Sequence, residues 1–220
     1  MNSYHHYLTA KYELEAVPIG IGGKRMEFYR IGDWAPFIEK LFDDEGGGFT
    51  DFPTWIKIWE ASLVLTDYML DSLLGTPQTV LEIDAGMGIT GMFLAAFGHH
   101  VSITDDKDDS LDLLRLNVEH NALKNANVKK LDWHHPDLTQ QFDVICGAEV
   151  ASTASSALLN LCRNHLKPDG AVYLAHDRQR INADKLISQL PKDMTVEEIG
   201  KTFTGKDTAR RIVIHIIRFK

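Results

Sequence analysis

Apolar and polar residues follow two different patterns through the middle of the chain. Short apolar runs are typical of buried strands, and they occur at residues 80–83, 101–105, 128–131, 142–148 and 171–175. Between them lie stretches that suit helices, several with an apolar face, at 92–97, 110–122, 154–166 and 181–190. Because strand and helix alternate, the pattern predicts a mostly parallel sheet with helices on both faces.

The two ends of the chain depart from this alternation. Residues 194–199 and 212–219 are both typical of strands, and the polar segment between them has no helical period, so an antiparallel hairpin is expected. The predicted fold class is therefore α/β, with a Rossmann-like doubly wound, mostly parallel seven-stranded sheet and an antiparallel C-terminal hairpin. Ahead of this core, residues 26–31 alternate like a strand, and a helix is expected from residue 55 to residue 74.

A glycine-rich turn joins the first core strand to its helix. The spacing Gly86-x-Gly88-x-x-Gly91 fits the fingerprint of a dinucleotide-binding turn. Glycines at such a turn let a ligand approach the backbone, and the following helix presents free N–H groups. Glycines in a strand-to-helix turn also serve plain geometry, so the spacing alone leaves a ligand site and a structural turn equally open.

Acidic residues stand at the ends of the predicted strands. Glu82 lies within the first apolar run, Asp105 ends the second, Asp132 follows the third and Glu149 lies just past the fourth. The carboxyl ends of parallel strands meet at one edge of a sheet, so these residues are expected to line one site. Asp105 suits a carboxylate that accepts both ribose hydroxyls, although the acidic residues after it also suit a helix cap. The order of strand, glycine turn, helix, strand and acid favours the ribose role.

Composition narrows the class of protein. The chain has 220 residues, 44% of them apolar, which suits one domain with a sizeable core. We expect residues 1–54 to be an N-terminal extension and residues 55–220 to be the core. The net charge of −8 argues against a general nucleic-acid binder. The sequence shows no signal peptide, membrane span or metal-ligand spacing, so a cytoplasmic protein without a metal or a membrane partner is expected.

Six segments together resemble the motifs of one family. They are Ile58 to Ser62, Val80 to Gly91, Ile103 to Asp105, Leu114 to Asn121, Leu131 to Trp133 and Phe142 to Val150. The chain resembles a class I, seven-strand S-adenosylmethionine-dependent methyltransferase. It is most similar to the group of methyltransferase-like protein-lysine methyltransferases, and the resemblance covers about residues 26–219.

The resemblance implies S-adenosylmethionine as cofactor and a role for each matching residue. The implied cofactor-binding residues are Trp59, Glu82, Asp84, Gly86, Gly88, Asp105, Asp132, Trp133 and Ala148. The glycines would carry the backbone round the methionine end of the cofactor, and Asp105 would hold the ribose. Asp132 and Trp133 would flank the adenine, and Trp59 would close over the cofactor. Glu149 is the implied catalytic residue, and the methyl acceptor is a protein or a small molecule.

Two residues depart from the family pattern. Asp84 stands where the glycine motif of the family normally has glycine. Its carboxylate would repel the carboxylate of the cofactor, or it would attract the sulfonium or the amino group. Ser152 stands where lysine-directed members have an aromatic residue, so the acceptor stays unassigned.

Three functions are compatible with these features. The leading hypothesis is a methyltransferase that acts on an unassigned nucleophile. The second is a non-catalytic methyltransferase-like protein with weakened or lost cofactor binding, which Asp84 favours. The third is a nicotinamide dehydrogenase, since the glycine fingerprint and Asp105 would also suit that cofactor. The long segment before the first core strand and the lack of a separate substrate domain argue against the third. The oligomeric state is not indicated by the sequence.

Overall fold

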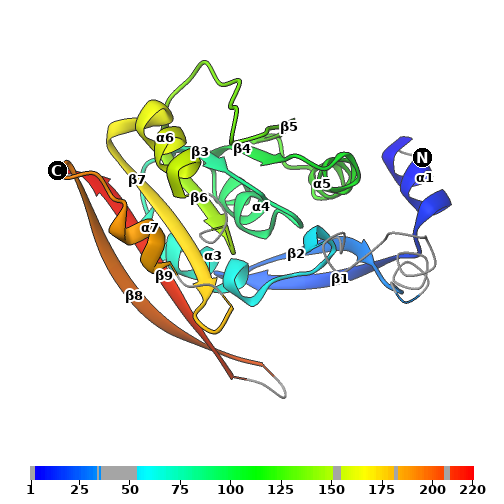
Figure 1. Cartoon of the computed structure of the whole chain (residues 1–220). Helices are drawn as coiled ribbons and strands as arrows, with labels where there is room; N and C mark the ends of the chain where they lie inside the picture. The colour runs from blue at the N-terminus through cyan, green and yellow to red at the C-terminus, as the bar shows by residue number, and fades with distance from the viewer. Residues whose placement is uncertain (1–2, 34, 36–53, 151–154, 181–182, 206–208) are drawn as a thin grey trace, which may run out of the picture.

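A seven-stranded sheet forms the centre of the molecule (Figure 1). The computed structural model describes residues 3–33, 35, 54–150, 155–180, 183–205 and 209–220. The strands of the sheet are β3 (Thr79–Glu82), β4 (His100–Asp105), β5 (Ala126–Lys130), β6 (Phe142–Ala148), β7 (Leu166–Asp177), β8 (Met194–Thr204) and β9 (Ala209–Phe219). Strands β3 to β7 pair in parallel, and β9 pairs antiparallel with both β7 and β8. The predicted sheet and its C-terminal hairpin are confirmed.

The strand order reverses at β3. The order is β5-β4-β3-β6-β7-β9-β8, so the chain winds outward from β3 first in one direction and then in the other. Glu82, the last residue of β3, pairs with Ile103 of β4 on one side and with Cys146 of β6 on the other. Ligands of doubly wound sheets bind at such a switch point, beyond the carboxyl ends of the strands.

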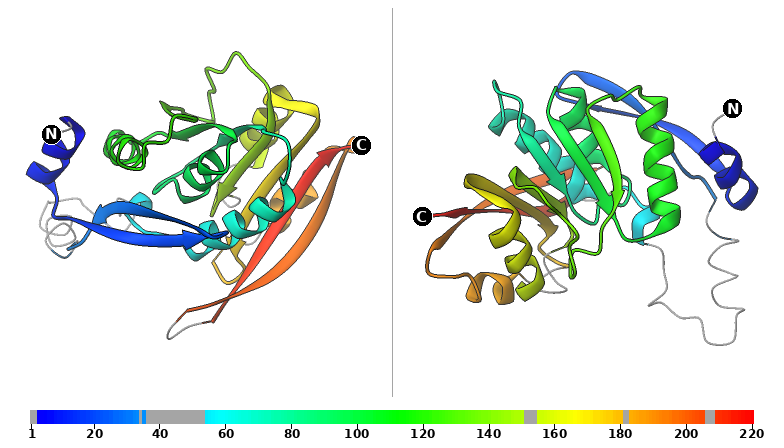
Figure 2. Two further views of the ribbon diagram at one scale, coloured as in Figure 1. Left: turned by 180° about the vertical axis from the view of Figure 1, so that it is seen from behind. Right: turned by 90° about the horizontal axis from the view of Figure 1, so that it is seen from above.

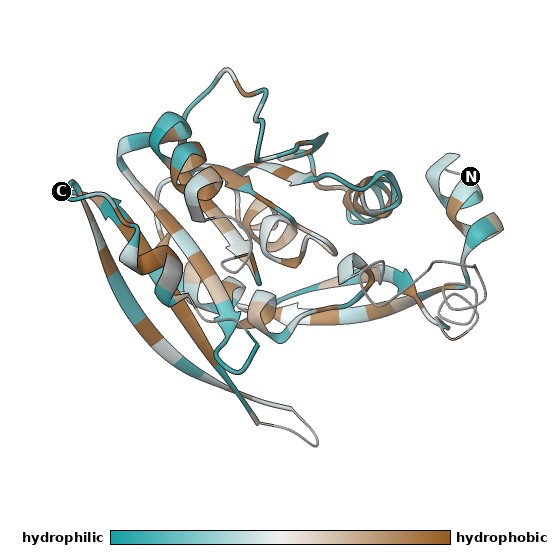
Figure 3. Cartoon of the chain, viewed as in Figure 1, coloured by the Kyte–Doolittle hydropathy of each residue, from teal (hydrophilic) through white to brown (hydrophobic). Residues whose placement is uncertain are grey.

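Helices cover both faces of the sheet (Figure 2). One face packs against α3 (Glu60–Ser72), α4 (Ile89–Ala96) and α5 (Asp108–His120), and the other against α6 (Ser155–His165) and α7 (Asp184–Ser188). Residues along each strand alternate between the two cores, as Val80 and Leu81 do in β3. In Figure 3 the same alternation appears as brown and teal bands along β8, whose outer face is polar.

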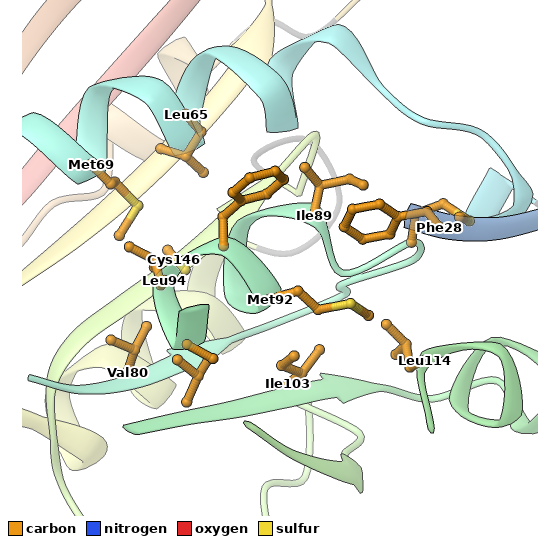
Figure 4. Close-up of a cluster of buried hydrophobic side chains, with 14 of the residues drawn as sticks. Phe28, Leu65, Met69, Val80, Ile89, Met92, Leu94, Ile103, Leu114 and Cys146 are labelled. Atoms are coloured by element: carbon orange, nitrogen blue, oxygen red, sulfur yellow. The ribbon is translucent and has the colours of Figure 1, made fainter. Parts of the chain in front are cut away.

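The core on the α3–α5 face is closely packed around α4. Val80, Ile103 and Cys146 project from three neighbouring strands toward Met92 of α4 and its neighbours (Figure 4). All four side chains are fully buried. The α4 helix is apolar along almost its whole length because it lies between the sheet and α3. This packing holds the first turn of α4, and with it the glycine turn, in place.

The helix predicted from residue 55 begins later than expected. Residues Thr54–Ile56 form a short 3-10 turn, η2, and α3 begins at Glu60. Trp59, at the N-cap, has an extended backbone with ψ 136°. Its indole Nε1–H donates a hydrogen bond to the carbonyl of Thr54 at 2.9 Å, which closes a loop that a continuous helix would not allow. The predicted helix start was therefore wrong, and Trp59 lies at a helix end instead of within a helix.

A second hairpin lies before the core. It consists of β1 (Leu14–Ile21) and β2 (Lys24–Ile31), and it follows helix α1 (Ser3–Lys11). Only the β2 part of this hairpin was predicted from the sequence. On the side of β2 away from β1, the side-chain amide of Asn117 bonds both the N–H and the C=O of Tyr29, at 2.7 and 3.0 Å. Asn121 bonds Glu27 in the same way at 3.1 and 2.8 Å, so α5 pairs with the outer edge of β2 through its side chains.

Two further features of the described residues concern thiols and membranes. Cys146 and Cys162 are buried free thiols. Among the described helices, none combines the length and the apolar character needed to cross a bilayer.

Candidate functional site

A cavity of about 330 Å³ opens at the carboxyl ends of β3, β4 and β6. It lies at the switch point of the sheet, and its size falls in the range of small-molecule sites. Seven of the residues singled out in the sequence line it: Trp59, Glu82, Asp84, Gly86, Asp105, Ala148 and Glu149. The structure thus brings together residues from four segments that are far apart along the chain.

The glycine turn is held by the acid at the end of β4. Asp105 accepts a hydrogen bond from the Gly86 N–H at 2.9 Å through Oδ2, and from the Lys107 N–H at 3.0 Å through Oδ1. Ser110 Oγ donates to the carbonyl of Gly86 at 3.1 Å. Gly86 has φ +53°, and a Cβ there would come within 3.4 Å of the Trp55 backbone. The positive φ favours glycine at this position, and Asp105 orders both the turn and the start of α5 while it lines the cavity.

Glu82 is a buried acid beneath the turn. It is 4% exposed, and its Oε2 accepts the Gly91 N–H of α4 at 3.0 Å. Burial, with a smaller contribution from the charge of Asp105, raises the pKa of Glu82 to about 8. At neutral pH the side chain is therefore mostly protonated, and its carboxyl group can donate a hydrogen bond.

Asp84 lies in the left-handed region of backbone space, with φ +51°. This conformation favours glycine, and aspartate is one of the few other residues that adopts it readily. The side chain is exposed, and one carboxylate oxygen from each of Asp84, Asp105 and Asp106 lies within 4.8 Å of the other two. Desolvation by the surrounding protein, together with these two charges, raises the pKa of Asp84 to about 6.

Two cations stand against the indole ring of Trp59. The Arg180 guanidinium lies 4.5 Å from the ring centroid, and the Lys57 Nζ lies 4.6 Å from it. Both are within the range of cation–π attraction. Glu60 lies near both cations, 3.7 Å from Arg180 and 3.9 Å from Lys57. These two cations beside Trp59 were not predicted from the sequence.

Glu149 follows β6 in a left-handed conformation, with φ +62°. Its N–H donates to the Ala175 carbonyl at 2.7 Å, and its Oε1 accepts the Asp177 N–H at 3.1 Å. Burial raises the pKa of Glu149, whereas the Asp177 hydrogen bond and the charge of Arg180 lower it. These contacts fix the carboxyl group next to the cavity wall, at the end of β7.

Three of the predicted residues lie outside this cavity. A Cβ on Gly88 would come within 2.4 Å of Leu114 Cδ2, so Gly88 serves close packing beneath the turn. Trp133 is 8% exposed and stacks on His134 at 4.4 Å, and Asp132 accepts the His134 N–H at 2.9 Å. Both lie next to the end of β5, where Leu131 N–H bonds the Asp105 carbonyl at 3.0 Å. Ser152, the second departure from the family pattern, lies outside the described residues.

Two residues of the cavity were not predicted from the sequence. Lys57 and Arg180 both line the cavity, yet neither belongs to a motif. The position of Arg180 just after the end of β7 is the one signal that could have found it, because other site residues also follow strand ends. Lys57 lies in the loop that the Trp59 hydrogen bond closes, and a continuous predicted helix concealed that loop.

The residues fit the amino-acid and ribose ends of S-adenosylmethionine. The carboxyl group of Asp105 suits a ribose, and the backbone at Gly86, which lines the cavity without a side chain, suits a thioether chain. The doubly wound sheet, its antiparallel last strand and this site define the class of S-adenosylmethionine-dependent methyltransferases.

Comparison with known sequences identifies the family. A family model described as lysine methyltransferase matches residues 53–193, and the chain belongs to this family. It is 31% identical over 155 residues to "Protein N-lysine methyltransferase METTL21A" of Mus musculus, across 64% of this chain and 69% of that protein. Its counterpart in Xenopus tropicalis is 30% identical over 136 residues, across 58% of this chain and 62% of that protein. "EEF1A lysine methyltransferase 3" of Mus musculus is 30% identical over 126 residues, across 54% of each chain.

Solved structures agree on the fold. The Thermus thermophilus 16S rRNA N2 G1207 methyltransferase, in complex with S-adenosylmethionine and guanosine, superposes with a TM-score of 0.62 at 22% identity. The match covers 94% of this chain and 50% of that one. A coclaurine N-methyltransferase bound to S-adenosylhomocysteine superposes with a TM-score of 0.56 at 16% identity, across 65% of this chain and 50% of that one. Family membership and fold together favour a methyltransferase over a nicotinamide dehydrogenase.

Proposed function

We propose that this protein transfers the methyl group of S-adenosylmethionine to a side-chain amine of a protein, such as that of a lysine. The observation that carries the proposal is the cavity at the switch point, where seven residues predicted from motifs converge. The named activity of the similar proteins in vertebrates supports a protein acceptor. The acidic composition of the chain supports it too, since a nucleic-acid acceptor would favour a basic surface. We also propose a cytoplasmic location.

Each cavity residue has a proposed task in binding. Asp105 would accept the ribose hydroxyls with the lone pairs that its two backbone bonds leave available. Gly86 would let the chain of the cofactor lie against the backbone, and Trp59 would cover it and exclude water. Asp132 and Trp133, at the end of β5, would flank the adenine, and Gly88 would support the turn from beneath.

Catalysis needs little beyond alignment. When bound, S-adenosylmethionine supplies a methyl group already activated by the positive sulfonium. The protein must hold the acceptor amine in line and keep it unprotonated. We assign this task to Glu149, whose carboxyl group is fixed beside the cavity and would accept a hydrogen bond or a proton from the amine.

Isothermal titration with S-adenosylmethionine, S-adenosylhomocysteine and NAD tests the proposal. We expect both adenosyl ligands to bind and NAD to give no heat. Asp105→Ala should weaken S-adenosylhomocysteine at least about 10-fold, because one charge-assisted hydrogen bond is worth about 1.5–3 kcal/mol. Asp112→Ala is the matched control, since Asp112 pairs with Arg115 outside the cavity. Equal affinity of Asp105→Ala and wild type would show that Asp105 serves only to hold the turn through its backbone hydrogen bonds.

A second candidate function rests on Asp84. Its carboxylate adds negative charge and backbone strain at the mouth of the cavity, which favours a methyltransferase-like protein without catalysis. Transfer of radiolabelled methyl to lysine in protein extracts, followed by amino-acid analysis, separates the two. Labelled methyllysine that depends on Glu149 supports the enzyme, whereas cofactor binding without any transfer supports the second candidate.

A further inference from the structure

The charged groups that line the cavity form two clusters. Asp84 and Asp105 contribute carboxylates beside the glycine turn, whereas Glu82 is mostly protonated at neutral pH. Lys57 and Arg180 stand on the side of Trp59. The amino-acid end of S-adenosylmethionine carries a carboxylate, a protonated amine and a neighbouring sulfonium. In this cavity the carboxylate of the cofactor would be repelled by Asp84 and Asp105, and its two positive groups would be attracted to them.

Among the described residues, no side-chain hydrogen bond engages the cations beside Trp59. Arg180 approaches Glu60 at 3.7 Å and Asp177 at 3.9 Å, and Lys57 approaches Glu60 at 3.9 Å. All three distances exceed the length of a hydrogen bond. The two side chains are 27% and 35% exposed, so they are partly desolvated and still reachable from the cavity. A planar guanidinium with available N–H groups is well suited to a carboxylate, which it binds with two parallel bonds.

We propose that Arg180, assisted by Lys57 across the ring of Trp59, forms the subsite for the carboxylate of the methionine part of the cofactor. The inference rests on the proposed function, because it requires S-adenosylmethionine in this cavity. It also gives a function to the segment after β7, in which Arg180 lies next to Trp59 and Glu60 at the N-terminus of α3. In this arrangement the Arg180 and Lys57 charges offset the repulsion that Asp84 exerts on the same carboxylate.

Two ligands that differ only in the carboxylate group test this subsite. The first is S-adenosylhomocysteine, and the second is its decarboxylated analogue, which keeps the adenosine, the thioether and the amine. Titration calorimetry on wild type, Arg180→Gln and Arg180→Lys then measures the carboxylate contribution directly. We expect Arg180→Gln to weaken S-adenosylhomocysteine 10-fold or more and to change the analogue less than 2-fold, with Arg180→Lys between the two. Lys57→Gln should show the same selectivity with a smaller loss.

Arg178→Gln is the matched control. Arg178 is a neighbouring arginine that pairs with Glu198 at 3.5 Å outside the cavity, so its variant should bind both ligands like wild type. Equal losses for the two ligands in Arg180→Gln, or unchanged binding of S-adenosylhomocysteine, would overturn the subsite while leaving the proposed function intact. Failure of wild type to bind either ligand would overturn the proposed function, and the subsite with it.

Discussion

Asp84 combines two unfavourable properties in one residue, a left-handed backbone and a charge near other acids. Asp84→Gly removes both the backbone strain and the charge, whereas Asp84→Asn removes only the charge. Comparison of the two variants therefore separates the effect of the backbone from that of the charge. We expect Asp84→Gly to raise Tm by about 2–4 °C, for a backbone gain of about 1 kcal/mol, and to tighten S-adenosylmethionine binding. Thermal unfolding and calorimetry of both variants measure these effects. Weaker binding by both variants would instead show that the carboxylate attracts the positive groups of the cofactor.

Glu82 makes stability depend on pH. Its pKa is about 8 in the folded protein and near 4.5 when unfolded, so folding favours the protonated form. This contribution is fully present below pH 4.5 and is lost as the pH rises through 8. We expect Glu82→Gln, which keeps an acceptor for the Gly91 N–H, to be more stable than wild type at pH 9 and to lose that advantage at pH 4. Urea unfolding between pH 4 and pH 9 measures the free energy of unfolding of both proteins. The same pH dependence in wild type and Glu82→Gln would contradict the prediction.

Site residues differ in how far sequence predicts them. Glu82 and Asp105 were found because they stand at strand ends within a recognisable order, and a local pattern suffices for that. Arg180 was missed because its place depends on how the loop after β7 folds onto Trp59. That contact joins residues far apart in the chain, so the local pattern of apolar and polar residues does not predict it.

At the scale of the elements, the first turn of α4 is tightly packed at Gly91 against β3 and β4. A Cβ on Gly91 would lie 2.4 Å from Glu82 Oε2 and 2.8 Å from Ile103 Cγ1. We expect Gly91→Ala to cost about 1–3 kcal/mol, the usual penalty for overpacking a core. Gly200→Ala in β8 is the control, because no atom lies within 4 Å of its Cβ position. Chemical denaturation compares the two, and an equal small effect would show that α4 shifts freely.

The regular elements were predicted better than the irregular ones. The central strands β3, β4, β6 and β7 are marked by apolar runs, since burial on both faces demands them. The edge strand β5 is only partly buried, and it begins two residues before its predicted start. The start of α3 was misplaced because the residues ahead of it suit a helix in composition. A hydrogen bond from the Trp59 indole to the Thr54 carbonyl instead closes a loop ahead of α3. Hydrophobic periodicity contains no information about such a bond. β1 was missed for a related reason, since it is largely exposed and its pattern is weak.

At the scale of the whole molecule, we propose that residues 1–220 form a single domain in which the extension at 1–54 is joined to the core at 55–220. Phe28 of β2 is fully buried and stacks on Phe93 of α4 at 6.1 Å. Phe28→Ala should cost about 3–5 kcal/mol and lower Tm by roughly 10 °C, with one cooperative transition. Leu74→Ala is the control, since Leu74 is 77% exposed. A separate early transition for the hairpin in calorimetry would divide the chain into two units.

The amide groups of Asn117 and Asn121 have a consequence beyond folding. They stand one helical turn apart and bond alternate residues of β2, so they occupy an edge that another strand would otherwise extend. Replacing either amide removes the hydrogen-bond partners of two backbone groups on this edge. We predict that Asn117 of α5 and Asn121 at its C-cap reduce self-association, so that their loss appears as concentration-dependent aggregation of protein that is still folded.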